Sequence, residues 1–139
     1  MSEARLVDTG PLVAFLNRRD RHHAWSVEAL GGVRPPLETC EAVLSEACFL
    51  LRKAPGGADS LMELVERELI VLRFDAKAEI AAVRRLLARY AEVPMSFADA
   101  CLVRMSEQRA SCRLLTLDSD FRRYRRHGRQ TIPLLAPAS

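Results

Sequence analysis

The amino-acid sequence predicts one α/β domain over residues 1–139, with three layers (α/β/α) around a short and mostly parallel central sheet. The main observation is that short apolar runs of strand length alternate with segments whose apolar residues recur at helical spacing. Strands separated by helices favour parallel pairing, with helices on both faces of the sheet. The length of 139 residues fits a single domain, and 49% hydrophobic with 28% charged residues is a globular composition.

The first part of the chain shows this alternation clearly. An apolar run over residues 4–8 predicts the first strand. Pro11 then stands where proline is favoured, just before a predicted helix over residues 12–19. A second helix is predicted over residues 22–30, and a very short strand over residues 37–38.

The middle of the chain predicts three helices and one strand. Apolar side chains recur at helical spacing over residues 40–53, and another helix is predicted over residues 58–68. The apolar run over residues 69–74 predicts a strand. Asp75 can cap a long helix over residues 76–90.

The last part predicts one helix and two strands. Ser96 can cap a helix over residues 97–108, and residues 113–117 form the next predicted strand. A weak strand over residues 131–134 is expected at a sheet edge, because Pro133 has no N–H to donate.

Charge and cysteine content limit the class of protein. The net charge is +3; of 21 Lys and Arg residues only Lys53 and Lys77 are lysine, which leaves 19 arginines. Arginine suits phosphate binding, although genomic base composition explains the bias equally well. The four cysteines have no CxxC spacing, no signal region begins the chain, and no apolar run approaches the ~18 residues of a membrane span. We therefore expect a cytoplasmic protein with reduced thiols and no membrane partner.

Two aspartates lie at the ends of predicted strands. Asp8 ends the first strand, and Asp118 directly follows the strand over residues 113–117. In a parallel sheet, functional groups gather beyond the carboxyl ends of the strands. Either aspartate taken alone is more often a helix cap than a functional group.

Two further acids belong to predicted helices. Glu46 falls on the apolar stripe of its helix, so burial there requires either a distant arginine or a cation. Asp99 is the third residue after Ser96, which is the spacing of a capping box. Asp99 also lies on the apolar stripe of its helix, and capping does not exclude metal binding.

Convergence of these four acids would create an electrostatic problem. Two unit charges ~4 Å apart repel by about 4 kcal/mol at an effective dielectric constant near 20. Clustered carboxylates therefore take up protons or bind a cation, and oxygen ligands select Mg²⁺ or Mn²⁺. Zinc is disfavoured, because His22, His23 and His127 have no ligand spacing with the cysteines.

Four segments, taken in order, resemble the motifs of PIN-domain nucleases. They are LVDTGPLV at 6–13, VLSEA at 43–47, FADA at 97–100 and LTLDSDFR at 115–122. Residues 17–23 are similar to the segment that follows the first helix in VapC-type toxins. The resemblance covers nearly the whole chain, and it implies a PIN-like fold and Mg²⁺- or Mn²⁺-dependent hydrolysis of RNA.

The resemblance also implies roles for individual residues. The catalytic and metal-binding acids would be Asp8, Glu46, Asp99 and Asp118. Glu46 would hold a second metal ion or orient the attacking water, and the sequence leaves open whether one or two ions bind. Asp120 would bind metal through water or cap the last helix, and the hydroxyls of Thr9 and Thr116 would support the ligands or the phosphate.

Arginines close to these acids are the candidates for contacts with RNA phosphates. They are Arg18, Arg19 and Arg21 after the first helix, and Arg122, Arg123, Arg125, Arg126 and Arg129 after the fourth acid. Tyr124 within the second run is a candidate to stack on a base. For any single arginine, a solvated surface is the more frequent explanation.

The resemblance further implies protein partners. VapC-type toxins usually act as homodimers and are held inactive by a cognate antitoxin. An antitoxin arginine would enter the acidic pocket, and the apolar helices over residues 40–53 and 58–68 would supply a groove.

Three alternatives remain at the level of sequence. The Asp118-Ser119-Asp120 segment resembles the paired acids of Toprim nucleases, although that family needs a glutamate where this chain has Asp8. A phosphatase of the haloacid-dehalogenase type needs an aspartate at the position of Gly10. The third alternative is a PIN fold that binds RNA or protein without catalysis, in which loss of acids would be expected.

Overall fold

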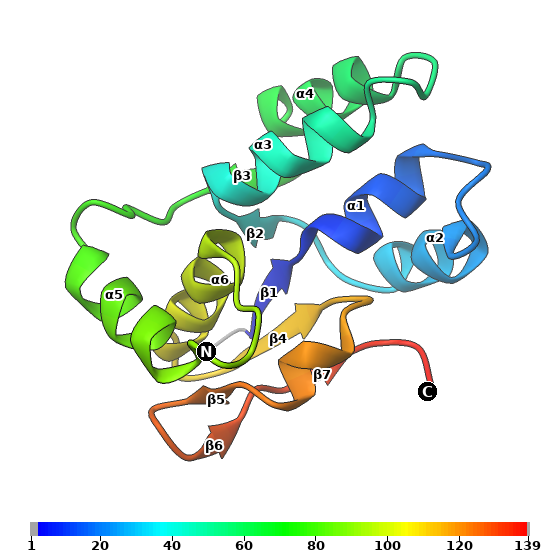
Figure 1. Cartoon of the computed structure of the whole chain (residues 1–139). Coiled ribbons are helices and arrows are strands. Elements are labelled where there is room, and N and C mark those ends of the chain that lie inside the picture. Colours follow the sequence, from blue (N-terminus) through cyan, green and yellow to red (C-terminus); the bar gives the residue numbers. More distant parts are fainter. Residues whose placement is uncertain (1–2, 139) are drawn as a thin grey trace.

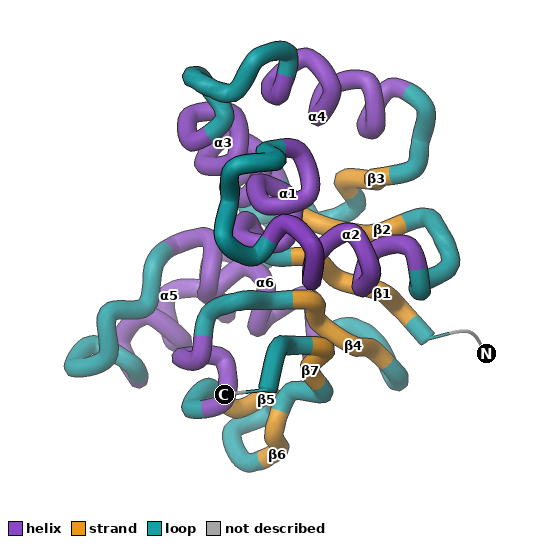
Figure 2. The backbone as a smooth tube through the Cα atoms, turned by 90° about the vertical axis from the view of Figure 1, so that its right-hand side faces the viewer, coloured by secondary structure: helices purple, strands orange, loops and turns teal. Residues whose placement is uncertain are grey.

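A five-stranded sheet forms the centre of the computed structural model, which describes residues 3–138. The strand order is β3-β2-β1-β4-β7, and all four neighbouring pairs are parallel. The strands are β1 (Ala4–Val7), β2 (Leu37–Thr39), β3 (Ile70–Leu72), β4 (Cys112–Leu115) and β7 (Leu134–Leu135). Figure 2 shows them following one another from β3 to β7. A small antiparallel hairpin is formed by β5 (Arg125–Arg126) and β6 (Gln130–Thr131).

Helices cover both faces of this sheet (Figure 1). They are α1 (Thr9–Leu16), α2 (His23–Gly31), α3 (Glu41–Leu50), α4 (Gly57–Glu66), α5 (Ile80–Arg89) and α6 (Phe97–Glu107), with a 3₁₀ helix η1 (Ser119–Arg122). Helices α1 and α2 lie on one side of the sheet and α5 and α6 on the other. The predicted three-layer class with a parallel sheet is therefore confirmed. No helix within residues 3–138 has the length and hydrophobicity to span a bilayer.

Several predicted element boundaries differ from the structure, and three of the differences have a clear local cause. Helix α1 starts at Thr9, because Asp8 caps it directly. Helix α5 starts at Ile80 instead of residue 76, since Asp75 Oδ1 accepts from the N–H of Ala78 at 3.1 Å and caps only a turn. The predicted strand over residues 131–134 is split between β6 and β7, consistent with the missing N–H of its proline. Strand β7 does lie at the sheet edge, as expected.

The centre of the core is the parallel pair of β1 and β4. Leu6 pairs with Leu114 and Val7 with Leu115, and all four side chains have no exposed surface. The backbone N–H of Asp8 continues this ladder by donating to the carbonyl of Leu115 at 2.9 Å. The register therefore brings the residues that follow both strands to the same edge of the sheet.

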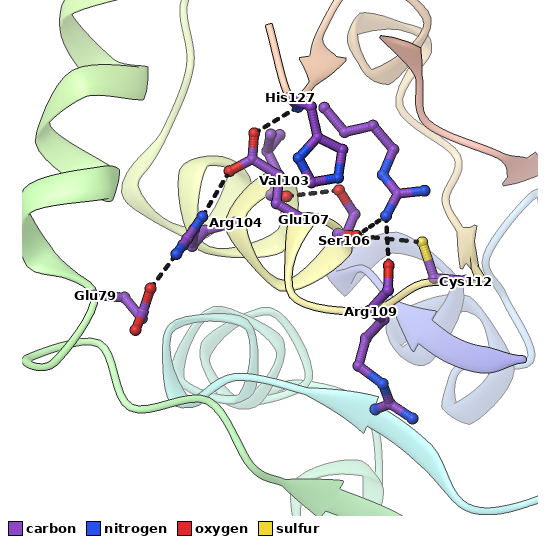
Figure 3. Close-up of polar contacts among 9 residues, drawn as sticks. Glu79, Val103, Arg104, Ser106, Glu107, Arg109, Cys112 and His127 are labelled. Carbon is purple, nitrogen blue, oxygen red and sulfur yellow. Dashed lines mark hydrogen bonds and ion pairs between the residues drawn. The ribbon is translucent and has the colours of Figure 1, made fainter. Parts of the chain in front are cut away.

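Polar contacts fasten the C-terminal hairpin to α6 (Figure 3). Arg104 on α6 donates to Glu79 Oε1 at 2.6 Å and to Glu107 Oε1 at 3.2 Å. The backbone N–H of His127, between β5 and β6, donates to Glu107 Oε2 at 2.8 Å. The hairpin, α6 and the segment before α5 are thus held together beside the sheet edge.

Candidate active site

Asp8 lies between β1 and α1, and both of its carboxylate oxygens accept hydrogen bonds. Oδ1 accepts from the N–H of Thr9 at 2.7 Å, and Oδ2 accepts from the hydroxyl of Thr116 at 2.7 Å. Burial, which leaves only 7% of Asp8 exposed, is the main reason why its pKa rises to about 6. The hydrogen bonds oppose this rise, and the charges of Asp99 and Asp118 add to it. Asp8 thus caps α1, and its ionised form is disfavoured by burial and by the two neighbouring negative charges.

Thr116 connects the ends of the two central strands. Its fully buried hydroxyl donates to Asp8 and accepts from the backbone N–H of Asp118 at 3.0 Å. Asp118 itself is exposed, and its Oδ1 accepts from the N–H of Asp120 at 2.9 Å, which caps η1. A single buried hydroxyl therefore sets the relative position of two of the predicted acids.

Asp99 forms the capping box that its spacing suggests. Its N–H donates to Ser96 Oγ at 3.0 Å, and its Oδ2 accepts from the N–H of Ser96 at 3.2 Å. The same Oδ2 accepts from the hydroxyl of Tyr124 at 3.2 Å. Burial raises the pKa of Asp99, and the charge of Asp118 contributes to the rise.

The predicted burial of Glu46 on the apolar stripe of its helix is wrong, because its side chain is exposed. The buried positions of α3 and its cap are Val43, Ala47 and Leu51, whereas Leu50 is 50% exposed. The helix packs through positions four residues apart, so Glu46 stands beside the buried face and at the rim of a pocket. Within residues 3–138 Glu46 has no ion-pair partner, so a distant arginine does not account for it.

The four predicted acids line one pocket of about 480 Å³. Its walls are formed by the β1–α1 junction, α3, the segment before α6 with the first turn of that helix, and the segment after β4. The lining residues are Asp8, Thr9, Gly10, Glu46, Leu50, Pro94, Ser96, Asp99, Leu117 and Asp118. None of these is Lys or Arg, so the pocket wall collects negative charge. The catalytic role of the acids stays a prediction.

The oxygen atoms that line the pocket are of the kind that bind a hard divalent cation. Four carboxylates share the pocket, and the Oγ1 of Thr9 is a buried hydroxyl oxygen without a hydrogen-bond partner within residues 3–138. Oxygen donors with this excess of negative charge are the ligands of Mg²⁺ and Mn²⁺. In the described part of the chain, however, no three acidic, thiol or imidazole side chains are grouped closely enough to form a metal site as they stand. The carboxylates would therefore have to move together around an ion.

Asp120 lies outside the pocket wall. It is half-buried, and its Oδ1 is 3.7 Å from Nη1 of Arg123. Its backbone N–H completes the cap of η1. These contacts favour the structural role among the two that the sequence left open.

The arginine candidates differ in their availability. Arg18 and Arg19 are exposed, as are Arg122 and Arg123. Arg122 donates to the carbonyl of Pro137 at 3.2 Å, and the half-buried Arg125 donates to the carbonyl of Arg122 at 2.7 Å. Arg18 and Arg19 are therefore more available to bind phosphate than Arg122 and Arg125, whose side chains already bind backbone carbonyls.

Two of the residues predicted to contact RNA, Tyr124 and Arg126, are buried in the structure. Tyr124 has no exposed surface, and its ring lies edge-on to those of Tyr90 and Phe121, at centroid distances of 5.1 and 5.2 Å. It cannot stack on a base; instead it contacts Asp99, a role that no local pattern signals. Arg126 is only 7% exposed and donates to the carbonyls of Ser106 and Arg109, so it holds the hairpin on α6.

Comparisons with known proteins agree with this architecture. The family model described as PIN domain matches residues 5–127 of the chain. Among solved structures, the chain is similar to VapC20 of Mycobacterium tuberculosis, described as a sarcin–ricin loop cleaving toxin. The TM-score is 0.74 and the identity 22%, over 84% of this chain and 92% of that one, which is a likeness of fold. A search of curated proteins finds no sequence match.

Proposed function

The chain belongs to the PIN domain family, and on this premise we propose that it is a metal-dependent ribonuclease of the VapC toxin type, with one domain. The observation that carries the proposal is the pocket lined by four acids from separate segments, with no Lys or Arg among the described residues of its wall. Carboxylates with only a structural role would be expected to pair with arginine, which is abundant in the chain.

The proposed ligands of Mg²⁺ or Mn²⁺ are Asp8, Asp99 and Asp118. When bound, such an ion activates water and neutralises the charge that builds up on the phosphate. Glu46 at the rim either orients that water as a base or contributes to a second ion. Thr116 fixes Asp8 by its hydrogen bond, and the hydroxyl of Thr9, which has no hydrogen-bond partner within residues 3–138, is available to a ligand or a phosphate oxygen.

RNA is negatively charged, so its binding at this acidic pocket requires basic side chains that contact its phosphates. Arg18 and Arg19 follow α1, whose first residue lines the pocket, and both are exposed. Arg122, Arg123 and Arg125 follow η1 and form the second set of proposed phosphate contacts. Because VapC20 is described as cleaving the sarcin–ricin loop, a structured RNA loop is a suitable first substrate.

An antitoxin and a second copy of the chain are the proposed protein partners. Exposed apolar side chains on α3 and α4 support a docking groove there: Phe49 is 62% exposed, Leu50 50% and Met62 40%. Leu50 also lines the acidic pocket, so a partner bound along α3 would reach it. An arginine from an antitoxin would then compete with metal for the carboxylates.

The decisive experiment is RNA cleavage by the purified chain with Mn²⁺ or Mg²⁺, compared with EDTA and with Asp8→Asn. We expect metal-dependent cleavage of an RNA panel that includes a sarcin–ricin loop oligonucleotide, and its loss in the variant. RNA binding without cleavage at any metal concentration would instead favour a non-catalytic PIN fold. Cleavage that persists in EDTA would contradict the proposal.

A further inference from the structure

A second cavity, of about 400 Å³, lies between α2 and the β4–β7 edge of the sheet. Its volume falls in the range of roughly 300–1,000 Å³ that is usual for small-molecule sites. On the helix side, one stripe of α2 and the residues that end it line the cavity: Trp25, Glu28, Ala29, Gly32 and Val33. The sheet side is formed by Arg113 on β4 and Leu135 on β7. Among the described residues, none lines both this cavity and the acidic pocket, so the two are separate.

Two arginines lie side by side on the face of the sheet that forms this wall. Arg5 on β1 and Arg113 on β4 are partners in the parallel register, so their side chains leave the same face of strands about 4.8 Å apart. Leu115, two residues after Arg113 and therefore on the same face, pairs with Leu135 of the cavity wall. Two like charges at this spacing repel each other, and an anion between or beside them removes the repulsion.

The guanidinium groups of this pair lack acceptors. The Nε atoms of Arg5 and Arg113 are both buried, and neither has a hydrogen-bond partner within residues 3–138. Arg5 makes no ion pair in that part of the chain. Nε of Arg113 is 3.5 Å from Oε1 of Glu3, an ion-pair contact without a hydrogen bond between side chains that are 39% and 42% exposed. So exposed a pair is weak, and most of the positive charge is left for a ligand.

Trp25 adds an aromatic surface to the same cavity. It is half-buried and is the single tryptophan of the chain. Its ring forms no aromatic pair within residues 3–138 and has no arginine over its face, whereas Arg52 covers the ring of Phe49. An aromatic face beside arginines is an arrangement that binds nucleotides, because the base stacks on the ring and the phosphate accepts from the guanidinium.

Glu28 determines which way round a nucleotide would lie. Its carboxylate is exposed on α2 and lines the cavity on the same side as Trp25. A carboxylate accepts hydrogen bonds from the N–H groups of a base and repels a phosphate. The base is therefore favoured on the α2 side and the phosphate on the side of Arg113.

We propose that this cavity binds a nucleotide, with its base against Trp25 and its phosphate on Arg113. Arg5, one strand further in, strengthens the attraction by its charge without lining the cavity. The nucleotide is either a free molecule or one unit of an RNA chain, and the same chemistry recognises both. The proposal does not rest on ribonuclease activity, because no acid of the acidic pocket takes part.

The test is a titration of Trp25 fluorescence in the full chain, in EDTA, with adenosine monophosphate as the probe. Excitation at the red edge of tryptophan absorption avoids absorption by the nucleotide. We expect saturable quenching that excess inorganic phosphate reverses, and at least about tenfold weaker binding of adenosine, which lacks the charged group. Absence of quenching, or equal affinity for adenosine, would overturn the proposal.

A short single-stranded oligoadenylate in the same titration distinguishes the two sources of the nucleotide. Binding about tenfold or more tighter than that of adenosine monophosphate would identify an RNA chain as the ligand, since further phosphates then contribute. Equal affinities would identify a free nucleotide. Both results support the site, provided that inorganic phosphate competes.

Variants locate the phosphate. Arg113→Gln should weaken binding of adenosine monophosphate by about tenfold or more, and Arg5→Gln should weaken it less. Arg67→Gln is the control, because Arg67 is exposed and directly follows α4, away from the cavity. Wild-type affinity in a folded Arg113→Gln chain would refute the assignment. Should that variant fail to fold, phosphate competition in the wild-type chain decides, because a single tryptophan reports on this cavity alone.

Discussion

The hydroxyl of Tyr124 donates a hydrogen bond to Oδ2 of Asp99, over an oxygen–oxygen distance of 3.2 Å. The same carboxylate oxygen accepts from the N–H of Ser96 at 3.2 Å, so two donors from different segments fix it. Tyr124 is fully buried and lies two residues after η1, so its hydrogen bond ties the C-terminal part of the chain to the acidic pocket. Partners that orient a ligand in this way typically affect metal affinity strongly when they are removed.

Tyr124→Phe should therefore weaken Mn²⁺ binding by about tenfold, measured by isothermal titration calorimetry. The matched control is Tyr90→Phe, which removes a buried hydroxyl that accepts from the N–H of Arg125 at 2.9 Å but does not touch an acid. The control should keep wild-type affinity for Mn²⁺ at a comparable Tm. Equal affinities in the two variants would show that Tyr124 only packs.

The metal-free protein should become less stable as pH rises through the range in which Asp8 ionises. The pKa of Asp8 is about 6 in the folded chain and 3.8 in the reference state, so between these values the folded state binds a proton that the unfolded state has released. Stability falls across this range by up to about 3 kcal/mol and stays lower above pH 6. Urea unfolding in EDTA at pH 5 and pH 7.5 should show about 1.4 kcal/mol of this loss, because the rest occurs below pH 5.

Asp8→Asn tests the assignment of this pH dependence. Asparagine keeps an oxygen for the N–H of Thr9 and does not ionise, so the loss of stability between pH 5 and pH 7.5 should shrink. A pH dependence identical to that of the wild-type chain would exclude Asp8 as its source.

Glu46→Gln should reduce RNA cleavage and Mn²⁺ affinity while changing the free energy of unfolding of the metal-free chain by less than about 0.5 kcal/mol. The reason is that Glu46 is exposed, at the pocket rim, and makes no ion pair within residues 3–138. Glu41→Gln, an exposed acid on the same helix, is the control and should leave cleavage unchanged. Full activity of Glu46→Gln would remove Glu46 from the site.

Replacement of Arg18 and Arg19 by alanine should weaken RNA binding and flatten its dependence on salt. Each phosphate contact that is lost should reduce the slope of log Kobs against log[salt] by about 0.7 to 0.9. Fluorescence anisotropy with labelled RNA at several salt concentrations measures this slope. Arg67→Ala is the control: Arg67 is exposed, directly follows α4 and pairs with Glu63, so its replacement should keep the wild-type slope.

Arg126→Ala should act on stability and not on RNA. The guanidinium donates to the carbonyls of Ser106 and Arg109 from a site that is 7% exposed, and its loss would leave these acceptors without that donor. We expect a loss of roughly 2 kcal/mol in the free energy of unfolding by urea. An unchanged unfolding midpoint together with weaker RNA binding would contradict this assignment.

The sequence by itself determined the fold class and the acids that could act together. Local patterns carry this information: apolar runs mark strands and helices, and aspartates after β1 and β4 must reach the same sheet edge once these strands pair in parallel. The capping box of Ser96 and Asp99 could also be predicted, because it depends only on a spacing of three residues. The PIN family resemblance rests on the same short segments, and the family model confirms it.

Only the tertiary structure decided which side chains are buried and what they touch. The sequence places Glu46 on the apolar stripe of its helix, but α3 packs through Val43, Ala47 and Leu51 and leaves Glu46 at a pocket rim. Tyr124 lies in an arginine-rich run typical of a surface, yet packing against Tyr90 and Phe121 buries it beside Asp99. Such contacts join residues far apart in the chain, and their energy depends on burial and distance, which periodicity along the sequence does not contain.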